Sequence, residues 1–155
     1  MIDQDTINAL RIIHRRLSDN QIKWAVVGST NMKLQGMNTE PHDLDVVLQY
    51  NDLQKVSNIF SDYSASSVKE LKSLTDKPAW EVNAKINGKD VQFIAGGEDD
   101  VYVSKLLSNQ ITHIKLDDID IPCFTLEAEL QAYRETNREH KAHLIQHYLS
   151  TRRGN

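Results

Sequence analysis

Two aspartates that stand two positions apart, Asp43 and Asp45, are the strongest candidates for chemistry in this chain. They open the run Asp-Leu-Asp-Val-Val-Leu, which is typical of a strand. In a strand, side chains at i and i+2 share a face, so the two carboxylates stand side by side, with Cα atoms roughly 6 to 7 Å apart. Like charges this close raise each other's pKa, and a bound cation removes the repulsion. Paired hard oxygen ligands suit Mg²⁺, which also binds phosphate oxygens.

A Gly-Ser pair, Gly28 and Ser29, precedes the aspartates and ends the apolar run of residues 24–27. Glycine lets the backbone approach a phosphate closely. Residues 30–36 suit a short helix with Ser29 or Thr30 near its N-cap, and the start of such a helix offers free N–H groups and the positive end of the helix dipole. We therefore expect the turn to hold phosphates and the acid pair to hold the metal that bridges them.

The dipeptide Asn87-Gly88 predicts a two-residue β-hairpin between strands 80–86 and 89–95. The resulting register pairs Val82 with Phe93, Asn83 with Gln92, Ala84 with Val91, and Lys85 with Asp90. One face of this hairpin is apolar. The other face carries Glu81, Asn83, Lys85, Asp90 and Gln92. This polar face is available to complete a site beside the acid pair.

The remaining elements follow from apolar periodicity and turn residues. We expect a helix over 5–18 capped by Asp3 or Asp5, strands at 24–27, 44–48, 111–116 and 119–124, and helices over 52–61 and 99–108. Residues 64–79 give no clear pattern, and 126–149 is one long helix or two. These elements indicate an α+β fold, a small mixed sheet flanked by helices. We expect one domain over 1–155, with a core of about 5–125 and a C-terminal helical segment of about 126–151.

Bulk properties exclude several classes of protein. A net charge of −4 gives no general attraction to nucleic acid or to anionic membranes. The one cysteine, Cys123, stands among apolar residues and is interpreted as a buried hydrophobe. No signal peptide and no apolar run long enough to span a membrane are visible, so we expect a cytoplasmic protein without a membrane partner.

Together these residues resemble the signature of the nucleotidyltransferase superfamily, whose members include DNA polymerase beta and antibiotic nucleotidyltransferases. The signature is a hydrophobic residue with Gly-Gly or Gly-Ser, a spacer, and then Asp-hydrophobic-Asp-hydrophobic. Here Val27-Gly28-Ser29 is followed by thirteen residues and then Asp43-Leu44-Asp45-Val46. The stretch is most similar to small stand-alone bacterial and archaeal members, and the resemblance covers residues 5 to about 95.

The resemblance implies a mechanism and a set of site residues. Gly28 and Ser29 would hold the β and γ phosphates of an NTP, and Asp43 and Asp45 would bind Mg²⁺ (or Mn²⁺). A hydroxyl of a small molecule, protein or RNA would attack the α phosphate and release pyrophosphate. In the C-terminal segment a basic residue often faces the nucleotide in such proteins, and Lys141 and Arg138 are the best candidates here.

One position departs from the family pattern. A third carboxylate normally completes the metal site and can activate the acceptor, but Gln92 occupies its expected place on strand 89–95. Asp90 points to the same side and could substitute, and Glu81 on the paired strand is a second candidate. If neither reaches the site, the alternative is a catalytically degenerate protein that binds a nucleotide or a protein partner, for instance in a toxin–antitoxin pair.

Other residues with chemical potential have simpler interpretations. His140, His143 and His147 have metal-binding spacing but suit an exposed helix face. His42-Asp43 would suit an all-helical phosphohydrolase, and Arg138 with His143 a helical ribonuclease toxin, but neither class fits a chain with strands. Arg134, Arg138 and Lys141 also suit a solvated helix face. The acids Asp117, Asp118 and Asp120 are interpreted as a turn between strands.

Overall fold

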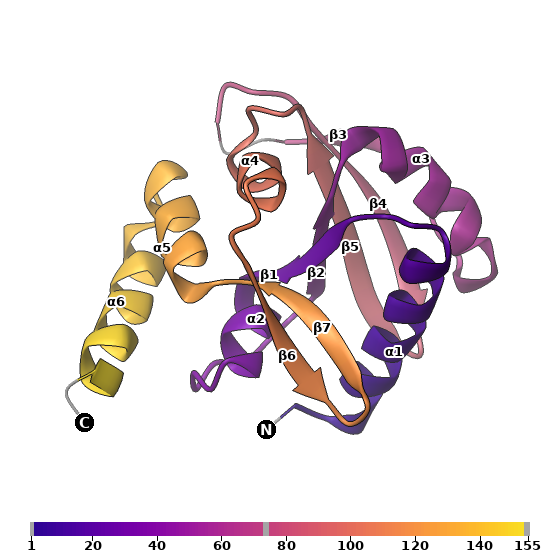
Figure 1. Cartoon of the computed structure of the whole chain (residues 1–155). Helices are drawn as coiled ribbons and strands as arrows, with labels where there is room; N and C mark the ends of the chain where they lie inside the picture. Colours follow the sequence, from indigo (N-terminus) through magenta and orange to yellow (C-terminus); the bar gives the residue numbers. More distant parts are fainter. Residues whose placement is uncertain (1, 73–74, 154–155) are drawn as a thin grey trace.

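The computed structural model describes residues 2–72 and 75–153, and these residues form a twisted mixed sheet with helices on both of its faces (Figure 1). The strands are β1 (Trp24–Val27), β2 (Leu44–Leu48), β3 (Lys69–Leu71), β4 (Ala79–Ile86), β5 (Lys89–Gly96), β6 (Ile111–Leu116) and β7 (Ile119–Phe124). The helices are α1 (Gln4–Asp19), α2 (Gly28–Leu34), α3 (Tyr50–Ile59), α4 (Val101–Leu107), α5 (Leu126–Glu135) and α6 (Glu139–Arg153), with a 3₁₀ turn, η1, at Ser61–Tyr63. The expected α+β class is therefore confirmed.

The strand order, β3-β4-β5-β2-β1-β7-β6, puts β2 at the centre of the sheet. On one side β2 runs antiparallel to β1, and on the other it runs parallel to β5. Because Val27 is paired with Asp45, the turn that follows β1 lies next to the acids at the start of β2. The topology therefore brings together the two motifs of the signature.

Two hydrophobic clusters lie on the two faces of the sheet. The larger includes Leu10, Ile13 and Leu17 of α1 and Val46 of β2. The smaller includes Val47 of β2, Val103 and Leu106 of α4, and Phe124 of β7. Alternation along β2 therefore sends Val46 to one cluster and Val47 to the other, and the face of Val47 is also the face of the acids. Cys123 belongs to the larger cluster and is fully buried, as expected.

The hairpin has the expected register at every predicted pair, from Val82–Phe93 to Lys85–Asp90, and the register continues to Ile86–Lys89 at the turn. Its two turn residues, Asn87 and Gly88, have φ of +53° and +79°. Two consecutive positive φ angles define the type I′ turn, which matches the twist of the flanking strands. The polar face of the hairpin is therefore fixed by the turn.

Several boundaries differ from the sequence expectations. Helix α2 begins at Gly28, and its N-cap is Val27, which makes no side-chain cap hydrogen bond; the expected cap at Ser29 or Thr30 is wrong. Helix α3 begins at Tyr50 and α4 at Val101, each two residues away from the expected start. The C-terminal segment forms two helices, α5 and α6, because Asn137 takes a left-handed φ of +59° between them.

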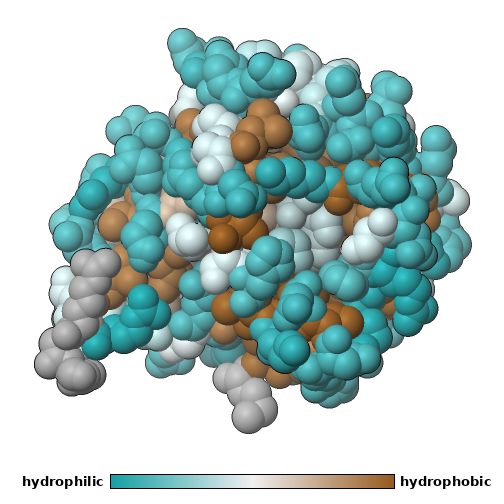
Figure 2. Space-filling model, in the orientation of Figure 1, coloured by the Kyte–Doolittle hydropathy of each residue, from teal (hydrophilic) through white to brown (hydrophobic). Residues whose placement is uncertain are grey.

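Among the described residues, no helix combines the length and the apolar character that crossing a membrane requires. On the face drawn in Figure 2, hydrophilic side chains cover most of the surface and apolar patches show between them.

Candidate nucleotide site

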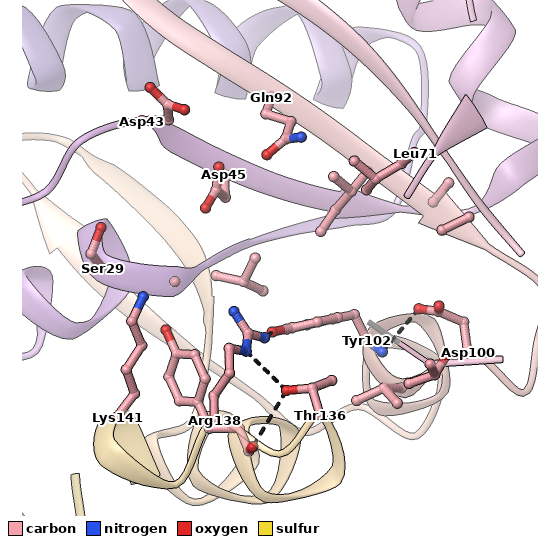
Figure 3. Close-up of a pocket in the computed structure, with 18 of the residues that line it drawn as sticks. Ser29, Asp43, Asp45, Leu71, Gln92, Asp100, Tyr102, Thr136, Arg138 and Lys141 are labelled. Carbon is pink, nitrogen blue, oxygen red and sulfur yellow. Dashed lines mark hydrogen bonds between the residues drawn. The ribbon is translucent and has the colours of Figure 1, made fainter. Parts of the chain in front are cut away.

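A cavity of about 420 Å³ opens between the sheet and the C-terminal helices. Six of the residues predicted from the sequence line it: Gly28, Ser29, Asp43, Asp45, Arg138 and Lys141. In Figure 3 both acids lie on the sheet side with Asp45 turned toward the cavity, and the two cations face it from the opposite side, at the start of α6. The fold therefore brings together three groups that are far apart in the sequence.

The carboxylates of the acid pair differ in their surroundings. Asp43 is exposed, whereas Asp45 lies on a strand between β1 and β5 and is largely enclosed. Burial raises the pKa of Asp45 to about 7, and the negative charge of Asp43 adds to the shift, while the charges of Lys141 and Arg138 oppose it. One oxygen of Asp45, Oδ1, is buried and has no hydrogen-bond partner among the described residues. A carboxylate oxygen left in this state favours a cation beside it.

Gly28 fits against Asp45 as only a glycine can. Its φ of +78° lies in the left-handed region, and a Cβ added there would be 2.9 Å from Oδ2 of Asp45. Such a contact is shorter than atoms tolerate, so a larger residue would displace either the turn or the carboxylate. The glycine thus serves the close packing of the turn against the acid strand.

The N–H of Gly28 faces away from the cavity. It donates to Oε1 of Glu129 at 2.6 Å, and Nδ2 of Asn31 donates to the same oxygen at 2.9 Å. This N–H is therefore engaged within the fold, so a phosphate at the turn would have to be bound by other groups. Glu129 is fully buried, and burial raises its pKa to about 7, although both hydrogen bonds act in the opposite direction. This carboxylate ties the turn to α5.

Arg138 is held in place by three contacts. Its Nη2 donates to the hydroxyl of Tyr102, its Nε donates to Oγ1 of Thr136 at 2.9 Å, and its guanidinium lies 4.5 Å from the ring centroid of Tyr133. The geometry is thus fixed in advance, which suits a group that meets a phosphate. Tyr102 and Tyr133 also line the cavity.

Lys141 has no carboxylate partner within residues 2–72 and 75–153. Its Nζ lies 5.6 Å from the ring centroid of Tyr133. Figure 3 shows the amine ending next to the ribbon of the turn that carries Ser29. An unpaired cation that faces the Gly-Ser turn is available to a bound anion.

The candidates for a third acid do not line this cavity. Asp90 is exposed, lies 3.5 Å from Nζ of Lys85, and lines a second cavity of about 260 Å³ together with Asp43 and Gln92. Glu81 accepts hydrogen bonds from Gln92 and Asn83. Gln92 is paired with Asp45 in the sheet and does line the main cavity, so glutamine stands in the place expected for the third carboxylate.

Apart from His42, Asp43, Arg138 and Lys141, the residues given simpler interpretations lie elsewhere. His140, His143 and His147 are exposed on α6, and Arg134 is exposed and donates to Gln146. Asp117 and Asp118 form the turn between β6 and β7, where both contact Arg11. None of these residues lines the main cavity, as far as the described residues define it.

Comparison with protein families gives a match to the aminoglycoside-2''-adenylyltransferase family over residues 9–147. The chain belongs to this family. The match covers most of the chain, including the acid pair, the Gly-Ser turn and both cations. It makes the protein a small member of the nucleotidyltransferase superfamily and confirms the resemblance seen in the sequence. A comparison with curated proteins gives no match.

Solved structures show the same nucleotidyltransferase fold. A Thermotoga maritima protein classed as a nucleotidyltransferase superposes with a TM-score of 0.74 at 24% identity, over 97% of this chain and 96% of the other. ANT(2'')-Ia, in complex with adenylyl-2''-tobramycin, superposes with a TM-score of 0.57 at 11% identity, over 93% of this chain and 91% of the other. At these identities the likeness concerns the fold alone.

A metal ion would have to be held by the acid pair, and these residues fit one. Asp45 presents the unpartnered oxygen, and the repulsion between the two carboxylates is what a cation would relieve. No group of three or more His, Cys, Asp or Glu side chains suited to a metal occurs among the described residues. This donor set matches Mg²⁺, which takes one or two carboxylates and completes its shell with water and phosphate oxygens.

Sequence reasoning missed Glu129, Tyr102 and Tyr133. Glu129 stands 101 positions from the glycine that it binds, and in the sequence it is one of two acids in the first turn of a helix. Its spacing could have given a signal: Thr125 caps α5, so Leu126, Glu129 and Tyr133 fall on one side of the helix. An acid on an otherwise apolar face indicates a buried polar contact.

Proposed function

We propose that this protein transfers a nucleoside monophosphate from an NTP to a hydroxyl acceptor, releasing pyrophosphate, and that it requires Mg²⁺ or Mn²⁺. The observation that supports this most is the convergence of the acid pair, the Gly-Ser turn and two cations on one cavity. Negative charge on one wall and positive charge on the other suit a triphosphate with its metal ion. A nucleotide alone or a metal alone would use only half of this arrangement.

The residues divide the work by charge. Asp43 and Asp45 hold the metal ion, which when bound neutralises phosphate charge. The Ser29 hydroxyl and the Lys141 amine bind the terminal phosphates, because both residues line the cavity. Arg138, fixed by Tyr102 and Thr136, stabilises charge that develops on the triphosphate.

In the reaction, the acceptor oxygen attacks the α phosphorus from the side opposite the leaving group. The bond between this phosphorus and the oxygen that bridges to the β phosphate breaks, and pyrophosphate leaves with that electron pair. The acceptor proton passes to solvent or to a nearby carboxylate. Asp90 is the candidate for the latter, since it lines the second cavity together with Asp43.

The family name and the tobramycin product bound to ANT(2'')-Ia favour ATP and an amino-sugar hydroxyl as the first pair to test. The wider acceptor class stays a hydroxyl on a small molecule, protein or RNA. Apolar side chains that line the cavity, Leu71, Ile94 and Val101, provide a surface for the base.

The test is transfer of label from the four α-³²P NTPs in the presence of Mg²⁺ or Mn²⁺, with tobramycin or a cell extract as acceptor. Asp43→Ala/Asp45→Ala should abolish transfer. The matched control is Asp117→Ala/Asp118→Ala, which removes two exposed acids from the turn at Arg11 and should leave transfer unchanged. Transfer that persists in the first double variant contradicts the proposal.

Gln92 favours a second candidate, a degenerate member that binds a nucleotide or a protein partner without turnover. A glutamine cannot take a proton from an acceptor, and Asp90 is exposed and paired with Lys85. Calorimetry with NTP and Mg²⁺ separates the two. Binding without transfer, in the native protein and in Gln92→Asp, supports the second candidate, and no binding contradicts both.

A further inference from the structure

Glu81 of β4 contacts Gln92 of β5 within the hairpin and does not itself line the main cavity. Its Oε1 accepts from Nε2 of Gln92 at 3.1 Å and from Nδ2 of Asn83 at 2.7 Å. Asn83 and Gln92 are direct partners across β4 and β5, and Glu81 lies two residues from Asn83 on the same face. One carboxylate oxygen thus gathers two side-chain amides.

This arrangement fixes which way the Gln92 amide points. An ionised carboxylate only accepts hydrogen bonds, so the amide group that meets it must present its NH₂. The carbonyl oxygen of Gln92 is then directed to the other side. Figure 3 shows this oxygen turned toward Asp45 and the nitrogen turned away from it.

The carbonyl oxygen of Gln92 therefore faces the place where a cation is expected. Asp45 and Gln92 are neighbours in register on parallel strands, and both line the cavity. Oδ1 of Asp45 is buried without a partner among the described residues. An amide carbonyl is a neutral, hard oxygen that Mg²⁺ and Mn²⁺ accept as a ligand.

We propose that Glu81 is a positioning residue, which holds the carbonyl oxygen of Gln92 toward Asp43 and Asp45 as a third, neutral oxygen of the metal site. The proposal rests on the proposed function, because it concerns the same metal ion. The cavity lining alone does not suggest this role for Glu81. Glu81 neither contacts the metal ion nor takes a proton, and it acts through the side-chain amide of Gln92.

The proposal has a chemical consequence for the site. Three oxygens of which two are charged carry −2, whereas three carboxylates carry −3, so this site binds its metal ion less tightly than a site of three acids. Its affinity also depends on the direction of one amide, which can rotate unless a partner holds it. Groups that orient a ligand commonly change metal affinity by about 10- to 100-fold.

The test is titration of the full chain with Mn²⁺, followed by electron paramagnetic resonance of the free ion. Glu81→Gln keeps the size of the side chain but can present its own NH₂ or oxygen to Gln92, so the amide is no longer fixed. We expect Mn²⁺ affinity to fall by about 10-fold. Glu70→Gln is the matched control, since it removes an exposed carboxylate from the neighbouring strand β3 and should leave the affinity unchanged.

A double-mutant cycle with Gln92→Asp separates positioning from general loss of structure. In the Gln92→Asp background Glu81 repels the new carboxylate, whereas a glutamine in place of Glu81 donates to it, so the effect of Glu81→Gln should reverse and Mn²⁺ affinity should rise. A purely structural role for Glu81 would lower the affinity in both backgrounds. That result overturns the proposal.

Gln92→Met gives a second route if Glu81→Gln does not fold. It removes the carbonyl oxygen at nearly constant size and should lose Mn²⁺ affinity to the same extent. Native affinity in Glu81→Gln or Gln92→Met, with affinity lost in Asp43→Ala/Asp45→Ala, overturns the role of Glu81 and leaves the proposed function standing. Absence of Mn²⁺ binding in the native protein, with and without NTP, overturns both.

Discussion

Opposing effects act on the ionisation of the Asp45 carboxyl group. Its place between two strands holds it out of water, which favours the neutral acid, and Asp43 beside it acts in the same direction. Lys141 and Arg138 act in the opposite direction but from across the cavity, so the pKa stays at about 7. At neutral pH a proton and a metal ion therefore compete for the same oxygens, and the metal-free site is a source of instability in the fold.

Replacing this carboxyl by its neutral isostere should stabilise the metal-free protein above neutral pH. Because the pKa of Asp45 is raised from 3.8 to about 7 on folding, its contribution to stability is present at low pH and is lost as pH rises through 7. In EDTA at pH 8, Asp45→Asn should raise the free energy of unfolding by about 4 kcal/mol, and at pH 5 by less than half of that. Urea denaturation at both pH values measures this.

Added Mg²⁺ should make the native protein more stable than Asp45→Asn, and this provides the control. With the metal at high concentration, the native protein gains stability by mass action, whereas Asp45→Asn has lost a ligand and should gain little. An equal gain in both proteins would mean that Asp45 does not hold the ion.

Gly28 and Gly88 can be compared to test whether the close packing of the Gly28 backbone against Asp45 matters for the site. Both have nearly the same left-handed φ, +78° and +79°, but a Cβ meets Asp45 at 2.9 Å in the first and nothing within 4 Å in the second. Each change to alanine should cost about 1 kcal/mol for the backbone conformation. Only Gly28→Ala should also weaken Mn²⁺ binding, measured by the same titration. Equal metal affinity in the two variants contradicts the packing argument.

At the level of elements, α5 reaches back to the turn between β1 and α2 through Glu129. This acid is buried, it accepts from Gly28 and Asn31, and its other oxygen has no partner among the described residues. A negative charge thus lies directly behind the turn proposed to hold phosphates. Its pKa of about 7 means that the charge is present at pH 8 and largely absent at pH 6.

Glu129→Gln should therefore change NTP affinity in a pH-dependent way. A glutamine keeps the accepting oxygen for Gly28 and Asn31 but removes the charge, so NTP should bind about 3- to 10-fold more tightly at pH 8 and equally well at pH 6. Calorimetry with NTP and Mg²⁺ at both pH values measures it. The exposed neighbour Glu127 supplies the control, since Glu127→Gln should leave affinity unchanged at either pH.

Short sequence patterns predicted most of the helices, strands and turns. The features that they missed depend on contacts between residues far apart in the sequence. Asn87-Gly88 fixes its turn through the φ angles that the two residues tolerate, and Asp3 caps α1 by accepting from the Thr6 N–H at 2.7 Å. By contrast, β3 exists because residues 69–71 pair with β4, and nothing in their own sequence favours a strand. The bond from Gly28 to Glu129 joins distant positions, so no local pattern contains it.

At the scale of the whole molecule, the cavity depends on how the C-terminal helices sit against the sheet. A third hydrophobic cluster joins α2 to α5 and α6; it consists of Met32, Met37, Leu126, Tyr133, Ala142, Ile145 and Leu149. Tyr148 adds a hydrogen bond from its hydroxyl to the carbonyl oxygen of Gln35, at 3.1 Å. Arg138 and Lys141 belong to the part of the chain that this cluster holds, so its packing sets the distance between the cations and the acid pair.

Weakening this cluster should therefore impair nucleotide binding from a distance. Ile145 is fully buried and does not line the main cavity, and Ile145→Ala should lower the free energy of unfolding by about 2 to 4 kcal/mol. Because α6 then packs loosely, NTP affinity should fall while Mn²⁺ affinity, which depends on β2, stays unchanged. The neighbour Leu144 is 46% exposed, so Leu144→Ala should change neither quantity. If Ile145→Ala lowers stability but binds NTP normally, the cations reach the nucleotide without the help of this packing.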